Sequence, residues 1–383
     1  MTHRLWLVNS ELTSTGAAAR TVRPAGAPAG TRPRIAFWDN ARFILIVLVV
    51  IGHALSTVRT DSAFAFGIYV YIYLFHMPAM ILLSGLFSRP ETTPKAIRAT
   101  LQLLVTWLLW EGIWALIHLT VEGKSPGDGF LVSPAWTLWF LVSLATMRIL
   151  LPFIARTRYP LTLSIAVSLA AGLLPPVDTD FSASRTLVFL PFFVAGWLIR
   201  ERGWLDGQWF VVPYRGVRIA AWGLFAVVAL SFSLVPQLRD FWRIDKRLTW
   251  RDDYDWVFRH APLGDWMPTG RFEIAAAGIG VSALLMAIAA AMTLALLIVV
   301  PRRQSRMTTW GARTLYVYLL HGPIIWGLRE AGTIEWAESF GTIGLIGLML
   351  FAVALAVALS ATWVTQVFRP IVEPSLNWLL KKE

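Results

Sequence analysis

Long apolar stretches, separated by short polar segments, run through most of this chain. About ten of them reach or approach the roughly 20 residues that an α-helix needs to cross the hydrocarbon core of a bilayer. The pattern predicts an all-α polytopic membrane protein, with about ten transmembrane helices in one bundle. The expected spans are residues 37–57, 64–87, 97–120, 134–154, 160–175, 185–200, 217–235, 274–300, 309–329 and 341–368.

Residues 1–33 have a different character. They are rich in Ala, Gly, Pro, Thr and Arg and show no apolar periodicity, a composition typical of segments that bury too little apolar surface to fold. We therefore predict a flexible basic cytoplasmic tail over residues 1–33 and a transmembrane domain over residues 34–383.

The distribution of Lys and Arg predicts how the bundle is oriented. Most basic residues fall in the segments that one side of the membrane would share, whereas short loops on the opposite side carry acids such as Asp178, Asp180 and Glu330. Because cytoplasmic loops are enriched in Lys and Arg, this pattern places both termini in the cytoplasm. The same bias explains the net charge of +11 and points to a lipid bilayer as partner rather than to nucleic acid.

Two features that the sequence lacks limit the kinds of reaction and transport that this chain can perform. The chain has no cysteine, which excludes a thiol nucleophile, a disulfide framework and a Cys-ligated metal. It also has no P-loop, which argues against ATP-driven transport by this polypeptide alone. We predict no metal site and no permanently bound cofactor.

Arg42 and His53 lie in the first expected span. Eleven helical steps make about three turns, so both side chains fall on one face, roughly 16 Å apart along the axis. Ionisable residues inside a membrane are costly and usually functional. The alternatives are that Arg42 only extends its charge to the membrane surface and that His53 is an inert core residue.

The other polar residues in the expected spans also separate by depth, with histidines near the middle of the membrane and most charged residues on the inner side. His76 and His321 are expected near mid-depth, and each is followed two residues later by a proline, which predicts a locally opened helix. An ordinary kink is the alternative for both. On the inner side the expected charged residues are Asp39, Lys95, Arg98 and Arg313. Because Arg and Lys bind phosphates and His is the usual general base at neutral pH, the pattern suits a cytoplasmic polyanion and a reaction nearer the outer surface.

The residues from Phe37 to Gly85 resemble the acyltransferase 3 family of integral membrane acyltransferases, and are most similar to its fucose 4-O-acetylase-like branch. The similarity extends over about residues 34–370. The matching elements are Trp38-Asp39-Asn40-Ala41-Arg42, the Arg-x10-His spacing ending at His53, Phe75-His76-Met77-Pro78, Ser84-Gly85, Trp139-Phe140-Leu141 and the run from Thr314 to His321.

This resemblance implies a bundle in the bacterial cytoplasmic membrane that uses acyl-CoA as co-substrate. The acyl group, usually acetyl, would pass from cytoplasmic acyl-CoA to a hydroxyl of a sugar, glycolipid or cell-envelope glycan on the outer side. The family's essential Arg and His correspond to Arg42 and His53. Its basic Arg-x-x-Arg corresponds to Lys95 and Arg98, and the lysine there keeps the charge but loses the bidentate geometry of arginine.

The expected mechanism assigns a role to each of these groups. Asp39, Arg42, Lys95, Arg98 and Arg313 would hold acyl-CoA at the inner mouth. His53 would act as general base on the acceptor hydroxyl. His76 or His321 would orient His53, donate to the oxyanion or protonate the leaving thiolate. A two-step route through an acyl group on His53 is the alternative.

The outer loop from about Pro236 to Arg271 is the expected acceptor-binding region. It carries several tryptophans, Trp242, Trp250, Trp256 and Trp266, among aspartates. Aromatic faces beside carboxylates suit sugar rings, and we predict that Trp250 and Trp256 bind the acceptor. The alternative is an amphipathic helix lying in the membrane interface.

Two other classes of function stay open. A transporter or flippase of a lipid-linked sugar or small metabolite would also carry intramembrane His, Arg and Glu. The chain shows no inverted repeat and no paired broken helices, which argues against it. A non-catalytic subunit of an envelope-polymer assembly would tolerate loss of His53.

Overall fold

The computed structural model describes residues 36–125, 127, 129–174, 180–234, 244–260 and 268–381, and every regular element in these ranges is a helix. The predicted flexible tail, residues 1–33, lies outside the described residues, as do Trp242 and Trp266. The longer helices are α1 (Ala36–Leu55), α2 (Ala63–Leu86), α3 (Pro94–Glu122), α4 (Trp139–Ile154), α5 (Pro160–Ala171), α6 (Ala183–Glu201), α8 (Arg215–Leu234), α12 (Arg271–Val299), α14 (Thr314–Glu330) and α16 (Gly341–Leu359). The short helices are α7 (Gln208–Val211), α10 (Ile244–Arg247), α11 (Tyr254–His260), α13 (Arg306–Gly311), α15 (Thr333–Glu338), α17 (Thr362–Val367) and α18 (Arg369–Val372).

The protein is an all-α polytopic membrane protein. Among the described residues, seven helices are long and apolar enough to cross a bilayer: α1, α2, α3, α6 with the turn before it, α8, α12 and α16. The expected spans over 134–154, 160–175 and 309–329 contain the shorter helices α4, α5 and α14. A total of ten crossings and a cytoplasmic position for both termini stay predictions.

Three expected spans are shorter or interrupted, two of them at contacts with residues distant in the sequence. The chain from Pro134 to Leu138 is irregular, and α4 starts only at Trp139. The span over 309–329 breaks after Gly311, where a Cβ atom would lie only 1.8 Å from the carbonyl oxygen of Asp39. The last span breaks at Ser360, whose carbonyl accepts a hydrogen bond of 2.7 Å from Arg313 Nη1. A cation at a helix carboxyl end satisfies carbonyls that the helix leaves unpaired.

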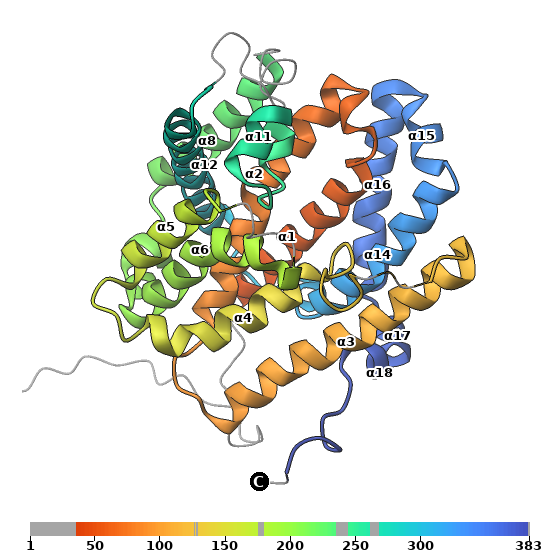
Figure 1. The fold of residues 1–383 in the computed structure, drawn as a ribbon, viewed down its shortest axis with the longest axis horizontal. Helices are drawn as coiled ribbons and strands as arrows, with labels where there is room; N and C mark the ends of the chain where they lie inside the picture. The colour runs from red at the N-terminus through yellow and green to blue at the C-terminus, as the bar shows by residue number, and fades with distance from the viewer. Residues whose placement is uncertain are drawn as a thin grey trace, which may run out of the picture. The chain divides into compact units, whose positions relative to one another are not determined.

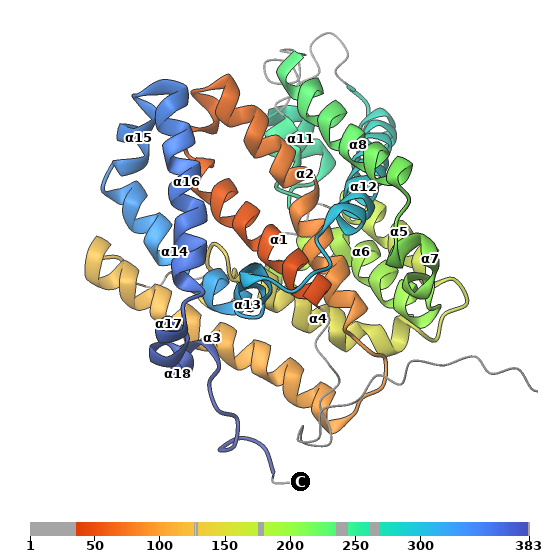
Figure 2. The same cartoon turned by 180° about the vertical axis from the view of Figure 1, so that it is seen from behind.

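Helix α1 packs against α2, α13, α14 and α16, and Figures 1 and 2 both show it enclosed by these elements. Its neighbour α2 also packs closely against α6. At their crossing, a Cβ atom on Gly85 would lie 2.0 Å from Phe193 O, and one on Gly196 would lie 2.1 Å from Leu82 O. Small residues let helix backbones approach in this way in a membrane protein. The Ser84-Gly85 element therefore has a packing role that places α2 beside α1.

Candidate active site

His53 occupies the last turn of α1 and contacts a histidine from the far end of the chain. Its Nδ1 atom lies 3.0 Å from Nε2 of His321 on α14, and the two rings stack with their centroids 5.1 Å apart. His321 is fully buried, whereas His53 is half-buried. The contact joins positions 268 residues apart in the sequence.

The partners of these rings decide which nitrogen carries each proton. His321 Nδ1 lies 2.8 Å from the carbonyl oxygen of Val317. Because a carbonyl only accepts, that nitrogen must donate, and a neutral His321 then has its lone pair on Nε2. His53 Nδ1 must therefore donate to His321, which leaves Nε2 of neutral His53 unprotonated. His53 thus has the tautomer of a general base, oriented by the ring behind it.

His76 on α2 shows the same local geometry. Its Nδ1 atom lies 2.7 Å from the carbonyl oxygen of Ile72, four residues earlier, as His321 Nδ1 does from Val317. In the neutral ring Nε2 is again the free acceptor. Both helices continue through the prolines that follow, Pro78 and Pro323. Neither helix is broken at its proline, so the expected local opening stays a prediction, and the shared His-x-Pro pattern corresponds to an imidazole bound to its own helix.

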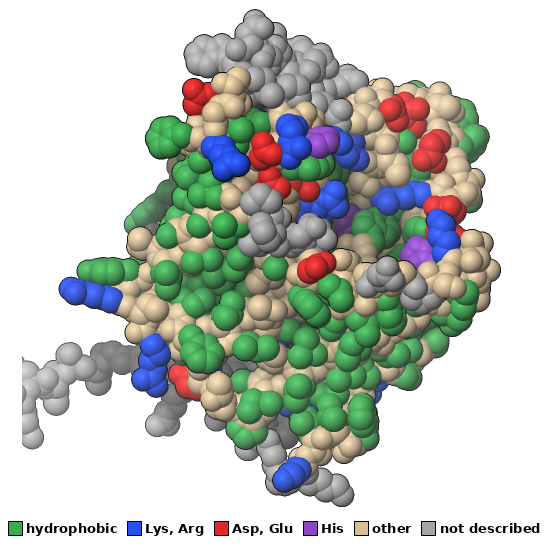
Figure 3. Space-filling view, viewed as in Figure 1, with side chains coloured by type: hydrophobic (Ala, Val, Ile, Leu, Met, Phe, Trp, Pro, Cys, Tyr) green, Lys and Arg blue, Asp and Glu red, His purple; other side chains and the backbone are tan. Residues whose placement is uncertain are grey.

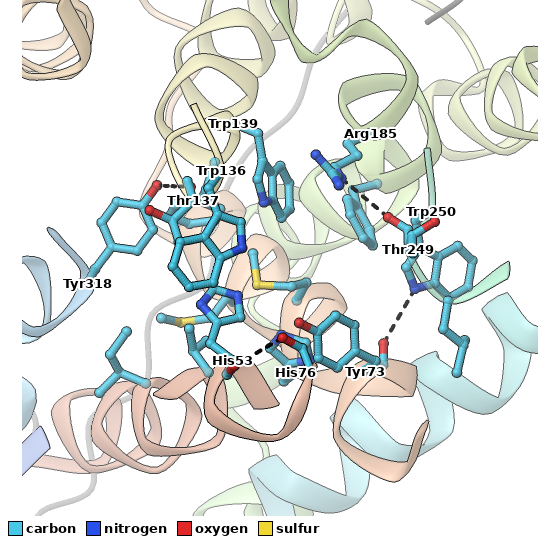
Figure 4. A pocket seen from close by; sticks show the side chains of 18 of the residues that line it. His53, Tyr73, His76, Trp136, Thr137, Trp139, Arg185, Thr249, Trp250 and Tyr318 are labelled. Atoms are coloured by element: carbon cyan, nitrogen blue, oxygen red, sulfur yellow. Dashed lines mark hydrogen bonds between the residues drawn. The ribbon is translucent and has the colours of Figure 1, made fainter. Parts of the chain in front are cut away.

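His53 and His76 line one cavity of about 310 Å³ (Figure 4). Along α1 its wall extends from Ile46 to Ser56, ten helical steps or about 15 Å. His321 does not line the cavity but lies behind His53. Of the two histidines expected to assist His53, His321 is thus placed to orient it and His76 to face a bound molecule. The described wall contains no Asp or Glu.

The segment from Leu248 to Arg251 forms part of the cavity wall. Trp250 has a positive φ of 55°, an unusual backbone conformation for a bulky residue. Its side chain is buried, and its indole nitrogen donates a hydrogen bond of 3.4 Å to Tyr73 O. Trp250 therefore enters the cavity wall, as Figure 4 shows, and is not exposed on a loop.

Buried polar contacts hold this segment in place. Asp245 on α10 is fully buried and forms an ion pair of 3.1 Å with Arg59, which follows α1. Arg247 donates to Ser282 Oγ on α12 at 2.5 Å, and its burial lowers the pKa of its guanidinium. Tyr254 N donates to Gly172 O at 2.8 Å. These contacts fix the backbone that carries Trp250.

Trp256, the other predicted acceptor residue, is not part of this wall. It lies on α11 and stacks on His260, with the ring centroids 4.1 Å apart. Of the two, only Trp250 lines the cavity that contains His53, and acceptor binding by Trp250 and Trp256 stays a prediction. The intervening turn separates them, because Trp250 points inward while α11 runs along the outer side of the segment.

Two arginines near His53 were not singled out from the sequence. Arg329 donates from Nη2 to His53 O and to Ser56 Oγ, and its guanidinium lies 4.3 Å from the ring centroid of Trp136. Arg185 lines the cavity and donates from Nε to Thr249 O at 3.2 Å. Each stands at one end of an expected span. Arg185 lines the cavity, whereas Arg329 contacts the backbone of His53 without lining it.

The residues expected to bind the donor lie toward the other end of α1. Arg42 forms an ion pair of 3.1 Å with Asp39 and lies 4.6 Å from the ring centroid of Phe87. Lys95 and Arg98 are exposed in the first turns of α3, and Arg98 donates to Asn377 Oδ1 at 2.8 Å. With the cap that Arg313 gives to α16, these residues have separate partners rather than a shared one. The structure without a ligand does not bring them into one cluster.

Glu111, whose role the sequence left open, is buried on α3. Its Oε1 atom accepts hydrogen bonds from Trp107 Nε1 at 2.7 Å and from the backbone nitrogen of Ala135 at 2.8 Å. The carboxylate therefore ties the chain before α4 to α3. This is a structural contact, and both of its donors are neutral.

Comparisons with known proteins agree with the resemblance found in the sequence. A family model described as an acyltransferase domain matches residues 35–365. Among curated proteins, the nodulation protein NolL of Mesorhizobium japonicum is 31% identical over 199 residues, covering 47% of this chain and 52% of NolL. NolL of Sinorhizobium fredii is 29% identical over 202 residues, covering 48% and 54%. This chain thus aligns with about half the length of these relatives. No solved structure matches.

Proposed function

We propose, from the premise that this chain belongs to the acyltransferase 3 family, that it is a membrane-bound O-acyltransferase. It moves an acyl group, most simply acetyl, from cytoplasmic acyl-CoA to a hydroxyl of a sugar, glycolipid or cell-envelope glycan on the outer side of the bacterial cytoplasmic membrane. The observation that carries this proposal is the pair His321–His53 at the wall of an elongated cavity. The pair presents an unprotonated imidazole nitrogen, which is what a general base requires.

The reaction we propose balances without any further reagent. His53 Nε2 takes the proton of the acceptor hydroxyl, and the hydroxyl oxygen attacks the thioester carbonyl. The carbon–sulfur bond then breaks, the new ester forms, and the thiolate of CoA leaves. That thiolate takes a proton from the His53 imidazolium, and His76 Nε2, on the same cavity, can accept a hydrogen bond from the bound acceptor. His321 accepts the Nδ1 proton of His53 throughout and keeps the ring oriented.

The length of the cavity supports a donor that enters from the inner side. Arg42 lies one helical turn before Ile46, where the cavity wall on α1 begins. We propose that Arg42 binds the phosphates of CoA, that Lys95, Arg98 and Arg313 join it when the donor binds, and that Asp39 orients Arg42 through their ion pair. The acyl arm would then extend about 16 Å along α1 from Arg42 to reach His53.

The test is acyl transfer in sealed membrane vesicles supplied with labelled acetyl-CoA. We expect wild type to label a glycan or glycolipid fraction, and His53→Ala to lose about 10²–10⁴-fold in rate, the usual contribution of general acid–base catalysis. Arg42→Ala should instead raise KM for acetyl-CoA, whereas the exposed cation Arg306, changed to Ala as a matched control, should not. The absence of label from wild type with a range of acyl-CoA donors would reject the proposal in favour of a transporter or flippase.

A further inference from the structure

The cavity wall is basic at its outer end. Arg185 and Arg251 line it beside His53 and His76, and the described wall contains no acidic side chain. Figure 3 shows this face, with Lys and Arg side chains gathered around a hollow in which a histidine is visible. A sugar that offers only hydroxyls would not need this charge, because neutral donors and aromatic faces suffice to bind it.

Arg185 is only partly satisfied by the protein. It is half-buried, its Nε atom donates to Thr249 O at 3.2 Å, and its guanidinium lies 4.8 Å from the ring centroid of Trp139. Within the described ranges its two terminal nitrogens make no hydrogen bond, and no carboxylate lies within ion-pair distance of it. Figure 4 shows the side chain reaching in between Trp139 and Trp250. A partly buried guanidinium without a counter-charge is costly unless a ligand supplies one.

Asp252, the acidic residue after the segment from Leu248 to Arg251, already has partners within the protein. Asp252 accepts from Thr249 Oγ1 at 2.8 Å and pairs with Arg251 at 3.2 Å. Its carboxylate lies outside the cavity wall, whereas Arg251 is on that wall and also exposed to the outer side. Arg251 therefore adds a second positive charge at the mouth, and Asp252 holds the backbone that positions it.

We infer that the outer end of the cavity binds an anionic group of the acceptor, a carboxylate or a phosphate, through Arg185 with support from Arg251. The inference rests on the proposed acyl transfer for the identity of the bound molecule as acceptor. Guanidinium groups bind carboxylates and phosphates in a planar, often bidentate geometry. An anion held there fixes the sugar while one of its hydroxyls reaches His53 Nε2, since Arg185 and His53 share one cavity.

The experiment is equilibrium binding to the full chain, reconstituted in nanodiscs of zwitterionic lipid. Three labelled probes share a glucose ring: methyl β-glucoside, methyl β-glucuronide and glucose 1-phosphate. We expect one charged probe to bind at least about tenfold tighter than the glucoside. A preference for the glucuronide identifies an acidic sugar as the acceptor, and a preference for glucose 1-phosphate identifies a phosphorylated one. Equal binding of all three probes would overturn the inference.

Variants separate recognition of the anion from a structural role. Arg185→Gln should bring the ratio of charged to neutral affinity close to one, and Arg185→Lys should restore part of it. Because Arg185 contacts Trp139 and Thr249, its loss can impair folding; the exposed Arg251, changed to Gln, then provides the same test with a smaller loss. Arg259→Gln is the matched control, since Arg259 is exposed like Arg251, lies in the same expected loop and pairs with Asp255. An unchanged affinity ratio in folded Arg185→Gln and Arg251→Gln would reject the site.

Transfer of labelled acetyl to the same three probes, measured in parallel, distinguishes the two proposals. Selective binding of a charged probe without transfer to any acceptor would reject acyl transfer and leave the anion site in place. Transfer to all three probes with equal kcat/KM would support acyl transfer and reject the anion site.

Discussion

Replacing His321 by Leu should slow acyl transfer without changing the affinity for acetyl-CoA. The substitution removes the acceptor of the bond between His53 Nδ1 and His321 Nε2, which is 3.0 Å long. The net value of such a bond is about 0.5–1.5 kcal/mol, or about 2–13-fold in rate if it is lost only in the transition state. Loss of the fixed tautomer and ring orientation adds to this; the removal of hydrogen-bond partners that orient metal-ligating histidines costs about 10–100-fold, and we expect a similar effect here. We expect kcat to fall about 10–100-fold.

The total contribution of a general base, about 10²–10⁴-fold, sets the upper limit of this effect. The assay is steady-state transfer with purified protein, with kcat and KM for acetyl-CoA determined separately and folding checked by thermal melting. His321→Gln is the matched variant, because its amide oxygen can still accept from His53, and it should recover part of the lost rate. If Leu and Gln at this position gave the wild-type kcat in folded protein, the assignment of the His53 tautomer would be refuted.

Two further predictions concern the packing that supports the site. Gly85→Ala should destabilise the fold by at least about 1–3 kcal/mol, because its Cβ would lie 2.0 Å from Phe193 O. The control is Gly67→Ala on the same helix, whose Cβ would meet nothing within 4 Å. The control should leave the melting temperature in detergent unchanged. Glu111→Gln should cost about 1–3 kcal/mol, since the two hydrogen bonds that Oε1 accepts lose the contribution of the carboxylate charge. KM for acetyl-CoA should stay constant. The exposed Glu91, changed to Gln, is the control, and equal melting temperatures for the two Gln variants would contradict this role.

The parts of the fold that depend on local pattern were predictable. The apolar runs around α1, α2, α3, α6, α8, α12 and α16 are long enough to be recognised by length alone. The breaks at Gly311 and Ser360 were not, because each is made by a contact with a distant residue, Asp39 O in one case and Arg313 in the other. Sequence periodicity records how apolar a segment is, but not where another helix approaches its backbone.

The candidate site shows the same limit. A functional role for His53 could be predicted because an ionisable residue is costly to place inside a membrane. The family resemblance then indicated which role it has. Which ring nitrogen of His53 carries the proton could not be predicted, because it depends on His321 Nε2, 268 residues away, and on the carbonyl of Val317 behind that ring. A sequence lists three histidines as equivalent candidates. The structure separates them: two line the cavity, and the third lies behind it.

The outer wall explains why the acceptor side was the hardest part to predict. Aromatic residues in the loop after α8 suggested an exposed sugar-binding surface, but a positive φ at Trp250 turns its indole inward onto Tyr73 O. The same turn brings Thr249 O to Arg185 on α6 and leaves Arg251 at the mouth. One strained residue thus joins a loop and a helix end into a single wall. Strain of this kind persists only where surrounding contacts enforce it. The buried pairs Asp245–Arg59 and Arg247–Ser282 provide such contacts and hold this part of the cavity wall in place.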